Sequence, residues 1–193
     1  MKKYDVIYAD PPWAFRCWSK KGAAKRSAAS HYDTMTMEEL IALRPTIDDI
    51  SAENCALFMW GTWPTMPDVM RLIDAWGFKY ITCGFLWAKL TKRWEEKLTD
   101  RHFVVDRLFH FGMGYYTRAN TEFCLLARRG KLGRFDDKSI RQLVIEPIRE
   151  HSRKPDKVRS LIERAYPNAN KIEMFARTRA EGWDVWGNET DKF

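Results

Sequence analysis

The sequence predicts an α/β fold in which a mainly parallel sheet is covered by helices on both faces. Predominantly apolar segments, such as residues 4–9 and 55–60, have the composition of strands buried on both faces. Segments with helix start and stop signals separate these strands, and this alternation builds parallel sheets. The chain has 193 residues without an internal repeat or a long linker, which indicates a single domain over residues 1–193.

The first half of the chain alternates strands and helices. Strands are expected at residues 4–9 (YDVIYA) and 55–60 (CALFMW). Thr36 is followed three residues later by Glu39, and this capping-box pattern opens a short helix. A further helix is expected over residues 67–76, because Pro67 suits a first turn and Gly77 suits a stop.

The second half repeats the alternation after one or two strands within residues 78–89. Strands are expected at residues 121–128, 171–177 and 183–186. A helix is expected over residues 155–165, with Pro155 as its first residue. Residues 90–118 are rich in charge and contain a Gly-Met-Gly break, and we assign no element to them.

The net charge of +7 permits a polyanionic partner. Residues 14–30 contain no acidic side chain, and their basic residues are Arg16, Lys20, Lys21, Lys25 and Arg26. Such a run is usually a solvated loop. Because it directly follows the motif described next, we favour a loop that contacts phosphate.

The sequence argues against a disulfide-linked secreted protein, a membrane protein and a metalloprotein. The cysteines lie far apart, and neither a disulfide framework nor a zinc site is indicated. The sequence shows neither a signal peptide nor an apolar stretch long enough for a membrane span, so the cytoplasm is the expected compartment. The histidines His102, His110 and His151 lack metal-ligand spacing, and no metal is expected.

Four residues that follow the first strand carry chemistry. Asp10 and the carbonyl of Pro11 can act as two fixed acceptors for the hydrogens of an aromatic amine. Such a pair would draw the nitrogen toward a tetrahedral shape and free its lone pair for attack. Pro12 keeps the turn open, and Trp13 offers a flat face on which a base can stack. A simple strand-ending turn is the alternative for an isolated Asp-Pro-Pro.

The segment YADPPW resembles the catalytic motif of the D-P-P-W branch of adenine-N6 methyltransferases. The catalytic subunit of the eukaryotic messenger-RNA adenosine methyltransferase typifies this branch, which includes bacterial and phage DNA adenine methyltransferases. The similarity continues in the same order through residues 31–35, 57–64, 75–78, 87–89, 122–125, 149–155, 171–177 and 182–189.

This resemblance implies a Rossmann-like fold with a permuted motif order and S-adenosylmethionine as cofactor. It implies that Lys154 pairs with the methionine carboxylate of the cofactor, and that Asp10 also faces its ammonium group. Contacts to its ribose and adenine are implied for Arg177, Asn188 and Glu189. Arg179 stands where the eukaryotic enzyme has a histidine and is a further candidate contact.

The resemblance also implies a nucleic-acid substrate. Tyr32 and Lys89 would face it, and Glu122 would orient the loops of the active site. The charge pattern of the segment after the motif assigns phosphate contacts to Lys20, Lys21, Lys25 and Arg26. We expect site-specific methylation of adenine in DNA, because a short chain without RNA-binding modules is similar to the bacterial and phage enzymes. An RNA methyltransferase and an inactive partner subunit are the alternatives, and intact Asp10 and Trp13 disfavour the second.

Two departures from the family leave questions open. The chain begins at the catalytic strand, without the upstream segment that lines part of the cofactor pocket in longer relatives, so either other residues line that side of the adenine pocket or the pocket is more open. Residues 91–116 have no close counterpart, and a surface excursion and a target-recognition insert remain equally open. The sequence leaves a homodimer open as well.

Overall fold

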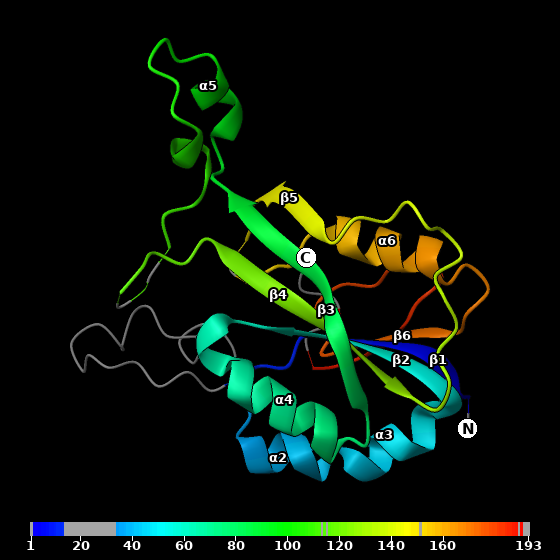
Figure 1. Ribbon diagram of the computed structural model, residues 1–193. Coiled ribbons are helices and arrows are strands. Elements are labelled where there is room, and N and C mark those ends of the chain that lie inside the picture. Colours follow the sequence, from blue (N-terminus) through cyan, green and yellow to red (C-terminus); the bar gives the residue numbers. More distant parts are fainter. Residues whose placement is uncertain are drawn as a thin grey trace. The chain divides into compact units, whose positions relative to one another are not determined.

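The computed structural model describes residues 2–13, 34–112, 114, 116–150, 152–188 and 190. Its strands form a seven-stranded sheet with the order β5-β3-β4-β2-β1-β6-β7 (Figure 1). Strands and helices alternate along the chain, so the predicted α/β class is confirmed. Within the described residues, no helix combines the length and the apolar composition needed to cross a membrane.

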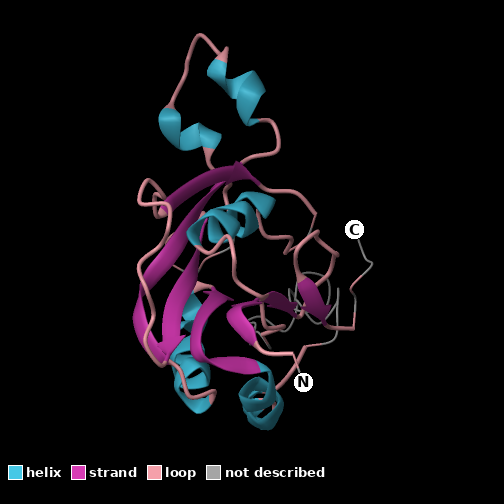
Figure 2. Ribbon diagram, turned by 90° about the vertical axis from the view of Figure 1, so that its right-hand side faces the viewer, coloured by secondary structure: helices cyan, strands magenta, loops and turns pink. Residues whose placement is uncertain are grey.

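Figure 2 distinguishes the helices, in cyan, from the strands, in magenta. The strands are β1 (Tyr4–Ala9), β2 (Ser51–Gly61), β3 (Lys79–Leu90), β4 (Thr121–Arg129), β5 (Leu143–Pro147), β6 (Lys171–Met174) and β7 (Asp184–Trp186). The α-helices are α2 (Met37–Ala42), α3 (Arg44–Ile50), α4 (Met66–Ala75), α5 (Trp94–Leu98) and α6 (Asp156–Ala165). Two 3₁₀ helices, η2 (Trp63–Thr65) and η3 (Val105–Leu108), complete the elements of the described residues.

Most strand pairs in the sheet are parallel. Strand β1 pairs in parallel with β2 and β6, β6 with β7, and β3 with β5. Strand β4 runs against β3, because the backbone N–H of Lys89 near the end of β3 donates to Asn120 just before β4, at 2.8 Å (Figure 1). The predicted mainly parallel sheet is therefore confirmed, with β4 as its antiparallel member.

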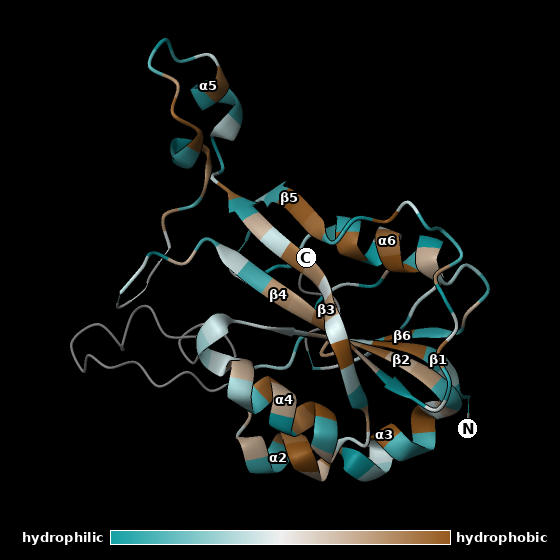
Figure 3. Cartoon of the chain, viewed as in Figure 1, coloured by the Kyte–Doolittle hydropathy of each residue, from teal (hydrophilic) through white to brown (hydrophobic). Residues whose placement is uncertain are grey.

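The chain forms two compact units, each with its own core. The first comprises Met1–Thr82, Leu125–Arg134 and Asn168–Phe193, and the second comprises Cys83–Cys124 and Phe135–Pro167. Val6, Leu57 and Phe58 are fully buried in the first unit, and Phe85 and Val158 in the second. Brown and teal bands alternate along α4 and α6 in Figure 3, as expected of helices with one buried side. The organisation of residues 1–193 as a single domain stays a prediction.

Several local expectations are confirmed. The backbone N–H of Glu39 donates to Thr36 Oγ1 at 3.2 Å, and the backbone N–H of Thr36 donates to Glu39 Oε2 at 2.7 Å. The capping box therefore opens α2 as predicted. Gly77 follows α4 with φ 76°, a left-handed conformation that favours glycine.

Other boundaries differ from expectation. Pro155 is the N-cap of α6 and not its first residue, so the helix begins at Asp156. Strand β6 ends at Met174 and not at residue 177, because Phe175 has φ 60° and cannot continue a strand. Residues 79–90 form one continuous strand, and α3 and β5 were not predicted.

Candidate active site

In the first unit, the Asp10–Trp13 motif lies at the carboxyl ends of parallel strands. Asp10 directly follows β1, and its backbone N–H donates to the carbonyl of Met174, the last residue of β6, at 3.5 Å. Loops at the carboxyl ends of parallel strands lie on one rim, where ligands of such sheets bind. The β1 strand therefore presents Asp10 at the rim of the first unit.

A tight turn orients the motif. The Trp13 backbone N–H donates to the carbonyl of Pro11 at 2.8 Å, and the Met35 N–H donates to the carbonyl of Pro12 at 3.0 Å. The first contact fixes the direction of the Pro11 carbonyl, and since a carbonyl oxygen has two lone pairs it can accept a second hydrogen bond.

The Trp13 side chain is firmly anchored. It is only 7% exposed, and its Nε1–H donates to the carbonyl of Trp60 in β2 at 3.2 Å. The Trp60 indole in turn donates to the hydroxyl of Tyr8 at 2.6 Å, and the Tyr8 ring meets Trp183 edge-on at 5.9 Å. This aromatic layer holds the motif rigidly, and it leaves little of the Trp13 face exposed for stacking.

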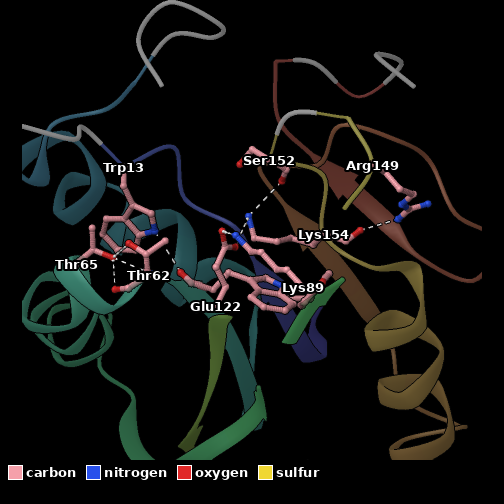
Figure 4. A network of polar contacts seen from close by, with 10 residues as sticks. Trp13, Thr62, Thr65, Lys89, Glu122, Arg149, Ser152 and Lys154 are labelled. Carbon is pink, nitrogen blue, oxygen red and sulfur yellow. Dashed lines mark hydrogen bonds and ion pairs between the residues drawn. The ribbon is translucent and has the colours of Figure 1, made fainter. Parts of the chain in front are cut away.

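Two threonines after β2, which were not expected from the sequence, belong to the same rim. The Thr62 backbone N–H donates to Thr65 Oγ1 at 3.0 Å, and Thr65 Oγ1–H donates to the Thr62 carbonyl at 2.9 Å. Figure 4 shows both side chains beside Trp13. They close the turn that follows Trp60 and so help to position the carbonyl to which Trp13 donates. A Thr-x-x-Thr spacing directly after a buried strand was the available signal.

The ends of β6 and β7 bring further polar residues to this rim. The backbone N–H of Ala176 donates to the carbonyl of Trp186 at 3.1 Å, so the loop after β6 lies against the end of β7. Arg177 is half-buried, and Asn188 is exposed two residues after β7. A Cβ atom at Gly187 would lie 3.0 Å from the backbone N and O of Ala176, so the close approach of these loops needs glycine there.

In the second unit, two lysines share one carboxylate. Lys89 Nζ donates to Glu122 Oε1, and Lys154 Nζ lies 3.5 Å from Glu122 Oε2. The three side chains are between 11% and 18% exposed, and they come from β3, β4 and the segment before α6 (Figure 4). With two ammonium groups and one carboxylate, the cluster carries one net positive charge.

Burial and charge compete at Glu122. Burial opposes its ionisation, but the charges of Lys154 and Lys89 outweigh that effect and hold the pKa of Glu122 below its ordinary value. The carboxylate is therefore ionised at neutral pH and attracts both ammonium groups.

The Lys154 side chain has further support. Its Nζ donates to the carbonyl of Ser152 at 3.2 Å, and Arg149 donates to the Lys154 carbonyl at 2.7 Å while pairing with Asp156 at 2.5 Å. These contacts connect the backbone around Lys154 to the first turn of α6.

Comparison with known proteins decides the family. A family model described as MT-A70 matches residues 4–189. The chain belongs to the MT-A70 family. Members of this family are S-adenosylmethionine-dependent adenine-N6 methyltransferases, and the chain accordingly uses that cofactor.

Individual relatives fall into two groups. The type II methyltransferase M.MunI of a Mycoplasma species is 36% identical over 203 aligned residues, covering 97% of this chain and 78% of the relative. The human N(6)-adenosine-methyltransferase catalytic subunit METTL3 is 25% identical over 98% of this chain. An Arabidopsis thaliana MT-A70-like N(6)-adenosine-methyltransferase is 26% identical over 96% of it. The chain spans only 28% and 24% of these two longer relatives.

Within this MT-A70 chain, the structure groups the expected site residues by unit. The rim of the first unit carries the motif Asp10–Trp13 together with Arg177, Arg179 and Asn188. The second unit brings Lys89, Glu122 and Lys154 together. Outside the described residues lie Lys20, Lys21, Lys25, Arg26, Tyr32 and Glu189. The pairing of both lysines with Glu122 is the main feature that sequence reasoning did not foresee.

Proposed function

We propose that this MT-A70 protein transfers a methyl group from S-adenosylmethionine to the N6 amine of adenine in DNA. The observation that carries the proposal is the placement of Asp10 and the Pro11 carbonyl at the carboxyl end of β1. An ionised carboxylate and a carbonyl, whose oxygen has two lone pairs, are two acceptors that together match the two hydrogens of an amine.

These acceptors address the difficulty of the reaction, because the adenine amine lone pair is delocalised into the ring. Hydrogen bonds to Asp10 and to the Pro11 carbonyl pull the nitrogen out of planarity and localise its lone pair. The cofactor would supply an electrophilic methyl group on a sulfonium, and the sulfur would keep the electron pair of the broken S–C bond and leave as a neutral thioether. As the nitrogen gains the methyl carbon it loses one proton, for which the Asp10 carboxylate is the adjacent acceptor. The anchored turn keeps both acceptors in place before the substrate arrives.

The chemistry of the polar groups fits the cofactor. The surplus positive charge of the cluster formed by Lys89, Glu122 and Lys154 suits the methionine carboxylate, with Lys154 as the contact. Arg177 and Asn188, after β6 and β7, offer donors for ribose hydroxyls and adenine. We assign Glu189 and Arg179 to the same part of the cofactor. The Arg179 side chain lies 3.4 Å from Thr190 Oγ1.

DNA is favoured as substrate by a relative of comparable length. M.MunI carries the type II designation, which is used for DNA methyltransferases, and 78% of it aligns with this chain. The basic residues after the motif, Lys20, Lys21, Lys25 and Arg26, are assigned to phosphate contacts. Tyr32 and Lys89 are assigned to the substrate. Adenine has to be flipped out of a duplex, or be single-stranded, to reach Asp10.

Transfer of labelled methyl groups to matched DNA and RNA oligonucleotides tests this proposal. We expect N6-methyladenine in DNA, identified by digestion and mass spectrometry. Asp10→Asn and Asp10→Ala should lower the rate by about 10²–10³-fold or more, since preorganised hydrogen bonds at a reacting centre contribute on that scale. Asp49→Asn, at an exposed carboxylate of α3, is the matched control and should retain activity.

Three outcomes would contradict the proposal. Methylation confined to RNA would overturn the DNA assignment and favour the function named for METTL3. Near-normal transfer by either Asp10 variant would remove Asp10 as an acceptor. Cofactor binding without methylation of either nucleic acid would indicate an inactive partner subunit.

A further inference from the structure

The rim of the first unit carries an exposed tryptophan near the buried one. Trp63 begins η2, two residues after β2 ends at Gly61, and its side chain is 50% exposed. Trp13, for which the sequence predicted stacking with a base, is only 7% exposed, and its indole N–H donates to the carbonyl of Trp60. Trp63 therefore offers the exposed aromatic surface that Trp13 does not.

The register of the sheet places Trp63 close to Asp10. In the parallel pair of β1 and β2, Ala9 is level with Met59. Asp10 therefore leaves β1 level with Trp60, the next residue of β2. Neighbouring strands lie about 4.8 Å apart, and the three residues from Trp60 to Trp63 span at most roughly 11 Å. Successive nucleotides of a duplex strand advance about 3.4 Å along its axis, so a base next to an adenine at Asp10 lies within this reach.

The backbone that carries Trp63 is held by hydrogen bonds of its own turn. The Thr62 backbone N–H donates to Thr65 Oγ1 at 3.0 Å, and the Met66 N–H donates to the carbonyl of Trp63. Thr65 is 6% exposed, and Figure 4 shows Thr62 and Thr65 beside Trp13. An aromatic side chain presented by an ordered turn loses little conformational freedom on binding, because the turn is in place before the partner arrives.

The charge of this segment indicates which part of a nucleic acid Trp63 meets. Residues 45–70 contain neither lysine nor arginine, and exposed Asp68 follows η2. The segment therefore offers no cation to a phosphate, and the carboxylate would repel one. The π-face of a nucleobase is uncharged and stacks on aromatic side chains, so a base is the part that fits.

We propose that Trp63 stacks on the nucleobase next to the target adenine. This inference rests on the proposed function, since it requires a nucleic acid whose adenine reaches Asp10. When the target adenine leaves its stack, the neighbouring base loses a stacking partner on one side, and the Trp63 indole takes that place. Every base has a π-face, so the contact tolerates any neighbouring base and forms with DNA and RNA alike.

Titration of the full chain into fluorescein-labelled single-stranded DNA with one adenine measures the contact without turnover. Trp63→Ala should raise the Kd roughly 5- to 150-fold, which is the range for loss of one base–aromatic stack, and Trp63→Phe should raise it much less. Trp63→Leu keeps apolar bulk without a π-face and should behave like Trp63→Ala. Tyr80→Ala, at a 41% exposed aromatic residue near the start of β3, is the matched control and should bind like the unmodified chain.

An abasic nucleotide identifies the base that Trp63 contacts. Removing the base on one side of the adenine should weaken binding by the unmodified chain but not weaken binding by Trp63→Ala any further, because the stack is already lost. The dependence of affinity on salt should be the same for both proteins, since no phosphate contact is removed. In methyl transfer, Trp63→Ala should raise the KM for the oligonucleotide and change kcat by about twofold or less.

Circular dichroism, the thermal midpoint and calorimetry with S-adenosylmethionine check that each variant is folded and keeps its cofactor affinity. Unchanged binding by Trp63→Ala and Trp63→Leu, a weaker salt dependence, or equal abasic losses in both proteins would overturn the inference. A fall in kcat at unchanged KM would also overturn it, and would place the ring on the target adenine. Binding without methylation of DNA or RNA would contradict the proposed function, while the titrations would still decide the role of Trp63.

Discussion

Replacing Glu122 with Gln tests whether the shared carboxylate holds the lysine cluster together. The change preserves size and one acceptor oxygen but removes the carboxylate that Lys89 and Lys154 share. The two ammonium groups, of side chains that are 18% and 11% exposed, then remain close together without a neutralising carboxylate. We expect the two ammonium groups to repel each other and the fold to lose stability.

The burial of the three side chains determines how much unfolding free energy Glu122→Gln should lose. Exposed ion pairs contribute about 0–1 kcal/mol, whereas breaking a buried pair costs roughly 3–5 kcal/mol. Because all three side chains are below 20% exposed, the second range applies, and the oxygen that Gln retains favours its lower end. A loss of about 3 kcal/mol corresponds to a fall in the thermal midpoint of roughly 6–12 °C for a domain of this size.

Chemical and thermal unfolding of the variant are the assays, with Glu96→Gln as the matched control. Glu96 pairs with Arg93 at 4.0 Å, and both side chains are more than 70% exposed, so this change should alter the free energy of unfolding by about 0.5 kcal/mol or less. Adding Lys89→Met to Glu122→Gln should recover part of the loss, because it removes the surplus charge.

The pH dependence provides a second readout. The fold lowers the pKa of Glu122, so its contribution to stability is fully present above its unfolded pKa, near 4.5, and is lost as the pH falls through the lower folded pKa. The difference in unfolding free energy between the unmodified chain and Glu122→Gln should be largest near neutral pH and shrink in acid. Equal stability of Glu122→Gln and Glu96→Gln at neutral pH would refute this account of the cluster.

Three further predictions concern binding and packing. Lys154→Ala should weaken S-adenosylmethionine binding by roughly 10- to 150-fold in calorimetry, as expected when a hydrogen bond to a charged group is removed. The control Lys157→Ala, at a 55% exposed lysine, should leave the affinity unchanged. Equal affinities of the two variants would show that Lys154 does not contact the cofactor. Neutralising Lys20, Lys21, Lys25 and Arg26 together should make DNA binding less sensitive to salt. The magnitude of the slope of log K for DNA binding against log salt should fall by about 0.9 for each phosphate that is no longer neutralised, and an unchanged slope would make this segment a solvated loop. Gly187→Ala should lower the free energy of unfolding by about 1–3 kcal/mol through overpacking, because its Cβ would lie 3.0 Å from backbone atoms of Ala176. In the control Gly133→Ala the added Cβ meets nothing within 4 Å, so this variant should be neutral. Similar stability of the two variants would contradict the close approach of the loops at Gly187.

Features that depend on a few neighbouring residues could be predicted from the sequence. Strand β1 has the predicted bounds, because a short apolar segment closed by Asp10 and two prolines has one compatible structure. The capping box of Thr36 and Glu39 and the left-handed Gly77 after α4 also form as predicted, since each depends on a few consecutive residues. The acceptor roles proposed for Asp10 and the Pro11 carbonyl rest on equally local residues, and they stay a prediction.

Elements with weak local signals were decided by their surroundings. Only Val144 is buried in β5, and the strand exists because it pairs in parallel with the second half of β3. Strand β6 was expected to continue to residue 177, but Phe175 leaves the strand and its ring lies 5.3 Å from Trp186. In both places a partner distant in sequence outweighs local propensity.

The pairing of the charged residues, in contrast, depends on the folded arrangement of distant segments. Lys89, Glu122 and Lys154 are separated by more than 30 residues each, and nothing in their local sequence indicates a common carboxylate. The antiparallel register of β4 against β3 brings Glu122 beside Lys89, and the segment before α6 brings Lys154 to the same side chain. An ion pair depends on distance in space and on exclusion of water, and for distant residues both are fixed only when the strands pair and the core closes.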